Sequence, residues 1–294
     1  MKIGLNFVSP LAFVLQRFTI ASIALLPVLV LLRKRIPKDS GTLGKLLFLS
    51  VINVAQLLVT SVGLLGESSG VGAVLTYTQP LFVFCLAIPF LKEKITSIKL
   101  VGAVIGFVGI VVLFLGKKSS LTLNSTLVMI FGGFLWAVTT VYYKEYLNHV
   151  NPFFTNFFQM TIGALCLAAL SLTTTSFVFP TEATYVWAVL YASVGSLVLG
   201  WTIWMILLKR GEATVLSGSI FIVPVVALLF GWLLLGESIK IESILGSALV
   251  LGGVCIVNLK SSARANSARQ PHPYKQNITF ISYQRVLEQT AQDD

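Results

Sequence analysis

Several side chains able to bind a small ligand lie inside long apolar stretches of this sequence. Arg17 is the most costly, because arginine at the centre of a membrane-spanning helix costs about 2.5–3.5 kcal/mol on insertion scales. Tyr77 and Gln79 stand just before Pro80, which removes a backbone donor and disturbs the helix around it. The remaining candidate binding residues are amides and indoles within apolar stretches: Gln56, Trp136, Gln159 and Trp201. Their chemistry is hydrogen bonding and ring stacking.

Each candidate also has a structural interpretation. Arg17 either donates to carbonyl oxygens at a helix end or contacts an anionic group of a ligand. Tyr77 and Gln79 either line a cavity that a proline kink opens or bond to neighbouring helices. Hydrogen bonds between membrane helices contribute about 0.6 kcal/mol on average, so structure alone can account for buried amides. For the indoles, packing is a commoner role than stacking on a ligand.

Groups that perform acid–base, nucleophilic or metal chemistry are not clustered in the sequence. Cys85, Cys166 and Cys255 fall in separate apolar stretches, which is typical of buried small residues rather than a disulfide or metal set. His149 and His272 have no carboxylate or cysteine at ligand spacing. We therefore expect no catalytic residue, no metal and no cofactor, and no proton coupling through a carboxylate in the middle of the membrane.

The composition is that of a membrane protein. Hydrophobic residues make up 56% of the chain and charged residues 11%, whereas soluble domains contain about 25% charged residues. The net charge is +10, but the basic residues lie at the ends of apolar stretches, as the positive-inside rule predicts. Because no basic stripe has interleaved aromatic residues, nucleic acid is not expected as a partner.

Apolar stretches long enough to cross a bilayer recur along the chain, since a spanning helix needs about 20 residues. They are continuous rather than alternating, which favours helices over strands. The sequence predicts nine spans: 10–32, 45–65, 70–91, 97–116, 126–147, 152–172, 185–208, 213–235 and 241–259. Residues 261–294 are polar and predict a disordered cytoplasmic tail, with a partner-binding role as the alternative.

The two halves of the chain resemble each other. A shift of 144 residues aligns a proline, a glutamate and two glycines without a gap: Pro80 with Pro224, Glu93 with Glu237, Gly102 with Gly246 and Gly109 with Gly253. A shift of 142 residues aligns Lys2 with Lys144 and Arg17 with Gln159. We assign the prolines to architecture, the glutamates to helix caps and the glycines to close helix packing. The sequence thus predicts a duplication, with repeats at 1–118 and 119–260.

The charges of matched loops indicate that the repeats have opposite orientations. Arg33, Lys34 and Arg35 correspond to the uncharged segment 173–177, and basic residues recur in only one loop of each pair. Inverted repeats of this kind are typical of secondary transporters.

The span at 126–147 has no complete counterpart, because Met1 aligns with Tyr143. We expect a ten-helix plan that lacks its first helix. Either the start is misassigned or truncated, or the protein has lost that helix.

The repeated segments resemble the EamA domain of the drug/metabolite transporter superfamily. The similarity rests on "EATVLSGSIFIVPVVALLFGWLLLGESI" from residue 212, on "SSGVGAVLTYTQPLFVFCLAIPFLKEKI" from residue 68 and on the glycines that follow each. It implies two five-helix inverted repeats, both termini in the cytoplasm and transport of small metabolites. The missing first helix departs from the family, in which it helps to line the central cavity.

These observations together predict an all-α transporter in the cell membrane. It is expected to move amino-acid-like or other small organic solutes by alternating access, with export favoured over import. The alternatives are a truncated, non-transporting subunit that needs a partner and, less favoured, an integral membrane enzyme. The expected partners are a small-molecule substrate and the lipid bilayer. The oligomeric state stays open, a homodimer included.

Overall fold

The structure is a computed structural model that describes most of the chain. It describes residues 1–32, 37, 39–91, 97–115, 120–172, 178–211, 213, 216–217, 223, 230–234, 236 and 241–268. Pro224, Glu93 and Glu237, most of the expected span 213–235 and residues 269–294 of the expected tail lie outside these ranges. The chain separates into two units, Met1–Asn258 and Leu259–Asp294. The described residues of the second unit, 259–268, are helical.

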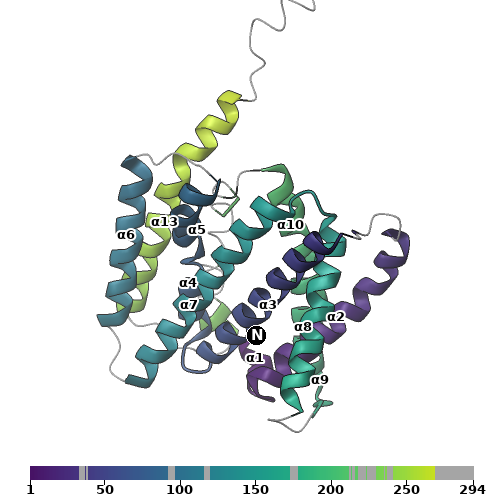
Figure 1. The fold of residues 1–294 in the computed structure, drawn as a ribbon. Helices are drawn as coiled ribbons and strands as arrows, with labels where there is room; N and C mark the ends of the chain where they lie inside the picture. The colour runs from purple at the N-terminus through teal and green to yellow at the C-terminus, as the bar shows by residue number, and fades with distance from the viewer. Residues whose placement is uncertain are drawn as a thin grey trace, which may run out of the picture. The chain divides into compact units, whose positions relative to one another are not determined.

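The described residues of the first unit form helices and short turns, with no strand among them (Figure 1). The α-helices are α1 (Lys2–Leu5), α2 (Pro10–Leu32), α3 (Ser40–Gly63), α4 (Ser69–Thr76), α5 (Gln79–Leu91), α6 (Ser97–Leu115), α7 (Ser120–Tyr142), α8 (Pro152–Ser171), α9 (Ala183–Leu190), α10 (Trp201–Arg210) and α13 (Ile241–Ala268). Two segments are π-helical, η2 (Tyr143–Leu147) and η3 (Tyr191–Gly200). The expected helical class is therefore confirmed for the described part of the chain.

Six helical stretches in the described ranges are long and apolar enough to cross a membrane. They are Pro10–Val28, Ser40–Gly63, Ser69–Leu91, Leu123–Leu147, Pro152–Ser171 and Ala183–Arg210. Each coincides with one of the nine expected spans. Of the other three, 97–116 is occupied by α6, and 241–259 lies within α13, whose apolar part is the shorter Ile244–Gly253.

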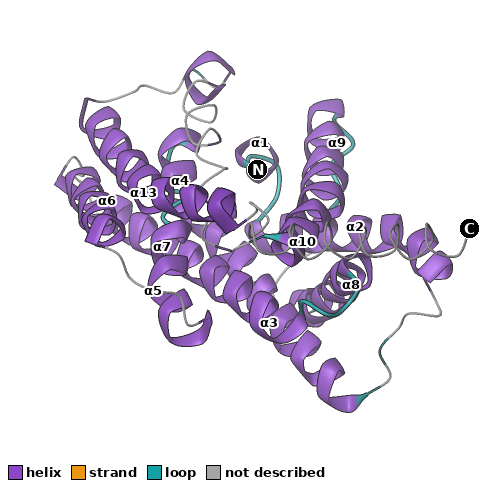
Figure 2. Ribbon diagram, turned by 90° about the horizontal axis from the view of Figure 1, so that it is seen from above, coloured by secondary structure: helices purple, strands orange, loops and turns teal. Residues whose placement is uncertain are grey.

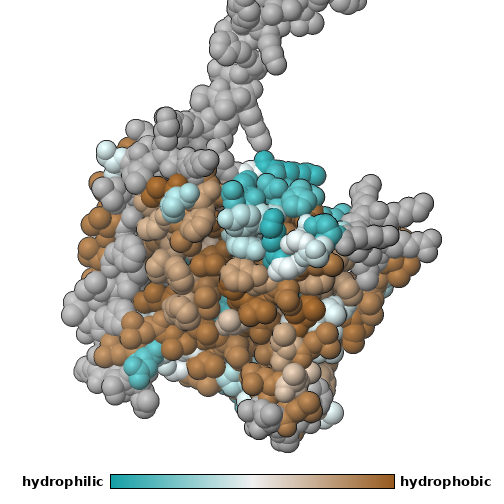
Figure 3. Space-filling model, viewed as in Figure 1, coloured by the Kyte–Doolittle hydropathy of each residue, from teal (hydrophilic) through white to brown (hydrophobic). Residues whose placement is uncertain are grey.

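The outer surface of these helices is apolar, as contact with lipid requires. Large hydrophobic side chains such as Val30, Leu165 and Trp187 are more than half exposed. Figure 3 shows apolar residues over most of one face of the described helices, with hydrophilic residues gathered toward one end.

The span Ser69–Leu91 is interrupted in its middle. Helix α4 ends at Thr76, Tyr77 and Thr78 form a turn, and α5 begins at Gln79. The Thr78 hydroxyl donates to Leu75 O at 2.7 Å, and Thr78 O accepts from Leu81 N at 2.9 Å, so side chain and backbone both stabilise the turn. The expected disturbance ahead of the proline is confirmed.

Helix α7 passes close to this interruption because it carries a glycine there. A Cβ atom on Gly133 would lie 2.9 Å from both Thr76 O and Thr78 Oγ1. The irregular backbone of the turn is thus covered by protein, the condition under which such backbone is tolerated at membrane depth.

The span Ala183–Arg210 contains a second irregularity, which the sequence did not predict. Between α9 and α10 the ten residues of η3 wind as a π-helix. Such segments occur frequently at functional sites. Helix α2 packs against η3, and α8 packs against both α2 and α3.

Helices α6 and α13 lie side by side in two perpendicular views (Figures 1 and 2). Glycines permit this close approach: a Cβ atom on Gly109 would lie 2.8 Å from Gly246 O, and one on Gly253 would collide with backbone atoms of Gly102 and Gly106. These obstacles are backbone atoms, which cannot rotate away.

Gly253→Leu is therefore expected to destabilise the protein by about 1–3 kcal/mol, the usual cost of overpacking. Gly252→Leu is the matched control, because a Cβ atom there meets nothing within 4 Å. Thermal unfolding of both variants in one detergent measures the difference. Equal melting temperatures would contradict the close crossing of α6 and α13.

Candidate functional site

Four aromatic residues from three parts of the fold meet in the interior and form what we call the aromatic cluster. Tyr77 from the turn between α4 and α5 stands edge-on to Trp136 of α7, with ring centroids 5.3 Å apart. Trp136 in turn contacts two indoles of α10, Trp201 at 6.4 Å and Trp204 at 6.3 Å. Three candidates that are far apart in sequence, Tyr77, Trp136 and Trp201, are thus brought together.

A small cavity of about 10 Å³ lies beside the cluster. Its lining comprises Leu49, Thr139, Thr140, Tyr143, Gln159, Trp201, Trp204, Met205 and Leu208. Gln79 reaches the same region, because its Nε2 atom donates to Thr140 Oγ1 at 3.2 Å. Two further candidates, Gln79 and Gln159, therefore join the three of the cluster.

Polar atoms at this site lack partners although they are buried. Trp136, Trp201 and Trp204 each leave the indole Nε1 atom without a hydrogen bond, as Tyr143 leaves its hydroxyl. Gln79 and Gln159 leave their Oε1 atoms unpaired. Leaving a buried donor or acceptor unsatisfied costs about 1–3 kcal/mol. Packing alone does not explain such a concentration of unpaired groups, and the donors and acceptors suit a bound solute or water.

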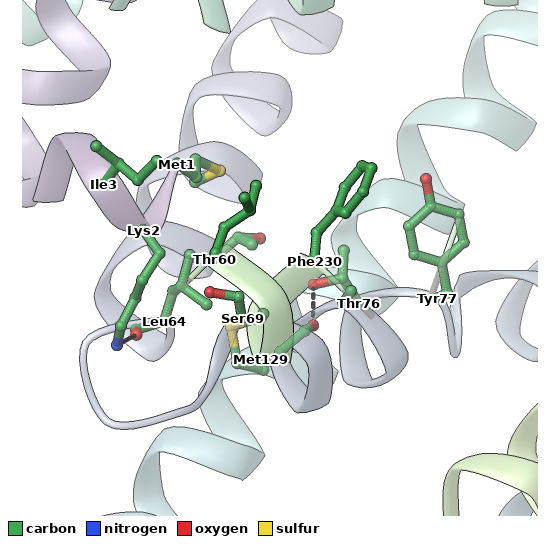
Figure 4. A pocket seen from close by; sticks show the side chains of 14 residues that line it. Met1, Lys2, Ile3, Thr60, Leu64, Ser69, Thr76, Tyr77, Met129 and Phe230 are labelled. Atoms are coloured by element: carbon green, nitrogen blue, oxygen red, sulfur yellow. Dashed lines mark hydrogen bonds between the residues drawn. The ribbon is translucent and has the colours of Figure 1, made fainter. Parts of the chain in front are cut away.

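A larger pocket of about 350 Å³ reaches the cluster from the end of the molecule that carries Lys2. Figure 4 shows Lys2 and Leu64 at one side of it and Tyr77 at the other. Thr60, Met129 and Phe230 are among its other lining residues. The volume lies within the range of small-molecule sites, about 300–1,000 Å³. Because Tyr77 lines this pocket and contacts Trp136, it separates the pocket from the cluster.

Two lysines hold helix C-termini by donating to carbonyl groups that helices leave unpaired. Lys2 Nζ donates to Leu64 O at 2.7 Å and to Glu67 O at 2.8 Å, just after α3. Lys144 Nζ donates to Leu208 O at 2.8 Å and to Gly211 O, at the end of α10. Lysine near a helix C-terminus also interacts favourably with the helix dipole.

Arg17 lies apart from the aromatic cluster. It is 2% exposed, and its Nε and Nη2 atoms donate to Ala192 O of η3 at 3.3 and 3.1 Å. The carbonyl-binding alternative describes these two contacts, whereas Nη1 has no partner. Asn156 of α8 binds the same π-helix, because its Nδ2 atom donates to Leu197 O and Thr202 Oγ1, both at 2.8 Å.

Gln56 bonds within its own helix. Its Nε2 atom donates to Thr60 Oγ1 at 3.2 Å, and the threonine hydroxyl donates to Gln56 O at 2.7 Å. Thr60 lines the larger pocket, so Gln56 supports the pocket wall through its neighbour. Glu67 is 4% exposed and accepts a hydrogen bond from Thr126 Oγ1 between two of the spans.

Trp204 and Tyr143 belong to the site but were not among the predicted binding residues. The signal for both was their helical spacing. Trp204 follows Trp201 by three residues, and Trp136, Thr140 and Tyr143 lie at intervals of four and three residues. Residues at these spacings share one helix face, so each partner could have been found from its neighbour.

The fold and the site define a helical membrane protein that crosses the bilayer several times and holds a buried polar and aromatic site. The chain belongs to the EamA-like transporter family, whose model matches residues 1–115 and 123–259. It is therefore a membrane transporter of that family.

Relatives of similar length carry the same designation. An uncharacterized transporter of Archaeoglobus fulgidus is 31% identical over 259 residues, which cover 87% of this chain and 91% of the relative. The uncharacterized transporter YoaV of Bacillus subtilis is 29% identical over 276 residues, which cover 90% and 92%. A protein of known crystal structure superposes with a TM-score of 0.67 over 88% of this chain and 91% of its own, at 17% identity, which shows the fold alone.

Asn156 and Asn53 provide a matched test of how buried amides contribute to stability. Both are at most 1% exposed, but Asn156 binds η3, whereas both amide atoms of Asn53 are unpaired. Asn156→Leu is expected to lower the free energy of unfolding by about 1–2 kcal/mol, because it removes hydrogen bonds between helices. Asn53→Leu is expected to be neutral or stabilising. Thermal unfolding of both variants measures this, and the reverse order of stabilities would contradict the assignment.

Proposed function

We propose that this transporter moves small organic metabolites across the cell membrane by alternating access between two inverted repeats, and that it works as an exporter. The observation that carries the proposal is the recurrence of the lysine contacts. The shift of 142 residues aligns Lys2 with Lys144, and the shift of 144 residues aligns Leu64 with Leu208 and Glu67 with Gly211. Each lysine therefore binds the equivalent carbonyl groups of its own half.

Helix packing supports the same relationship between the halves. Helix α3 occupies the place in the first half that η3 and α10 occupy in the second, and α2 corresponds to α8. The α8–α3 contact then has the α2–η3 contact as its equivalent, and both occur. The two ranges matched by the family model, 1–115 and 123–259, support repeats at 1–118 and 119–260.

In an inverted arrangement the two lysine contacts lie at opposite membrane faces. We place Lys144 at the cytoplasmic face and Lys2 at the outer face, because the basic loop residues otherwise gather on the Lys144 side. The larger pocket lines the Lys2 end, whereas the Lys144 end holds only the cavity of about 10 Å³. This conformation is then open to the outside and closed to the cytoplasm, and the opposite state completes the transport cycle.

The lysine contact at the cytoplasmic face is expected to stabilise the outward-open state. Hydrogen bonds to charged groups contribute about 1.5–3 kcal/mol, so Lys144→Met is expected to shift the conformational equilibrium toward the cytoplasm by about tenfold or more. Labelling of single cysteines by a membrane-impermeant maleimide measures this, once the native Cys85, Cys166 and Cys255 are replaced by serine. Ala73→Cys reports on the larger pocket and Thr139→Cys on the small cavity.

In the Lys144→Met background, labelling of Ala73→Cys from outside should fall, and labelling of Thr139→Cys from the cytoplasmic side should rise. Lys45→Met is the control, because Lys45 is exposed and contacts only the ring of Tyr146 among the interactions described for it. If both cysteines react equally from both sides in every background, alternating access is wrong.

Transport itself is tested with a pool of metabolites. Proteoliposomes loaded with amino acids, nucleobases, organic acids and amines are expected to release part of the pool faster than protein-free liposomes, as mass spectrometry of the outside medium measures. Vesicles of both orientations from cells that overproduce the chain then give the direction. Faster uptake into inside-out vesicles than into right-side-out vesicles indicates export, and the reverse would contradict it.

A further inference from the structure

We propose that the aromatic cluster binds an uncharged, flat heterocycle that carries both hydrogen-bond acceptors and an N–H donor, as nucleobases do. The inference rests on the proposed function, since it takes the cluster and the adjoining cavity as the transport site. It narrows the substrate from small metabolites in general to one chemical class, and it excludes zwitterionic amino acids and organic ions.

The absence of charge on the cavity lining is the first argument. Hydroxyl, amide, indole and apolar side chains line the small cavity, and no ionisable acid or base other than the phenol of Tyr143 is among its described lining residues. The larger pocket has Lys2 as the charged side chain of its described lining, and Leu64 and Glu67 carbonyls already occupy it. A carboxylate or an ammonium entering the cluster would lose water without gaining an opposite charge, which is costly.

The kind of polar atom that is left unpaired gives the second argument. The indole N–H groups of Trp201 and Trp204 can only donate, and both are buried without an acceptor at the cavity. The Oε1 atom of Gln159 can only accept, and it is buried without a donor. A ligand with ring-nitrogen or carbonyl acceptors and one N–H group satisfies all three atoms at once. An apolar aromatic solute would leave each of them unsatisfied.

The arrangement of the rings favours a flat ligand. Trp136 and Trp201 are inclined by only 34°, the smallest interplanar angle within the cluster, whereas Tyr77 stands at 87° to Trp136. A planar ring that enters beside Trp201 gains stacking with the indole and hydrogen bonds at its edge from Trp204. An aromatic cage could also bind a quaternary ammonium ion. The unpaired N–H groups argue against this, because their positive hydrogens repel a cation.

Access to the cluster depends on Tyr77. The present cavity of about 10 Å³ holds roughly one water molecule, so a solute must displace a ring to enter. Tyr77 is placed to move, because it sits in the turn between α4 and α5 and one side of it faces the larger pocket. A solute in that pocket therefore meets this ring before it reaches Trp136 and the unpaired donors.

Binding of tritiated adenine to the purified full chain, measured by scintillation proximity, tests this inference. Unlabelled adenine and uracil are expected to compete, whereas leucine, benzoate and choline are not. Trp204→Phe keeps an aromatic ring but removes the N–H donor, and it is expected to weaken adenine binding about tenfold. Trp187→Phe is the control, because Trp187 is 72% exposed on α9, and it should bind within about twofold of the native chain. Trp201→Phe serves as a second variant if Trp204→Phe does not fold.

Each other outcome overturns the inference in a distinguishable way. If adenine binds but both indole variants bind it as the native chain does, the site is not the aromatic cluster. If leucine, benzoate or choline binds in place of adenine, or if no probe binds while the metabolite pool is still transported, the substrate class is wrong and the transporter stands. If no probe binds and nothing in the pool is released, the inference and the proposed function are both wrong.

Discussion

The need to satisfy every backbone polar group inside the membrane is the constraint on which this structure depends. A spanning helix meets it without help, but this fold interrupts two of its spans, with a turn at Tyr77 and Thr78 and with the π-helix η3. Irregular backbone at this depth is tolerated only where protein or water covers it. Gly133 brings α7 onto the first interruption, and α2 and α8 cover the second. The interruptions and the helices around them therefore form one arrangement.

Most of the costly polar side chains in the spans serve the backbone. Arg17 and Asn156 donate to carbonyl groups of η3, and Lys2 and Lys144 donate to the carbonyl groups at the ends of α3 and α10. The indole N–H groups of the aromatic cluster are different, because they are buried and bind no carbonyl. A fold that finds an acceptor for so many donors but leaves these unpaired points to the cluster as the place where something else binds.

The spans and part of the site were predictable because they follow from local properties of the sequence. Length and apolarity alone locate a span, and the polar residues before Pro80 marked the first interruption. The π-helix was not predictable, because Tyr191–Gly200 has no proline and its residues suit an α-helix equally well. The acceptor of Arg17 could not be predicted either, since it is a carbonyl group 175 residues away that only the fold brings near. Tyr143 was missed because it lies just past the end of α7, although its spacing from Trp136 places it on the same face.

The equivalent positions of Arg17 and Gln159 indicate how the two halves divide their tasks. In the first half the long cation extends to the backbone of η3 and holds an irregular helix in place. In the second half the shorter, uncharged amide stops at the small cavity and leaves Oε1 unpaired beside the indoles. An arginine at residue 159 would bring a buried charge to the cavity with no anion among its described lining residues, which is strongly unfavourable. The difference between the halves thus keeps charge away from the site while the shared lysine contacts keep the ends of α3 and α10 alike.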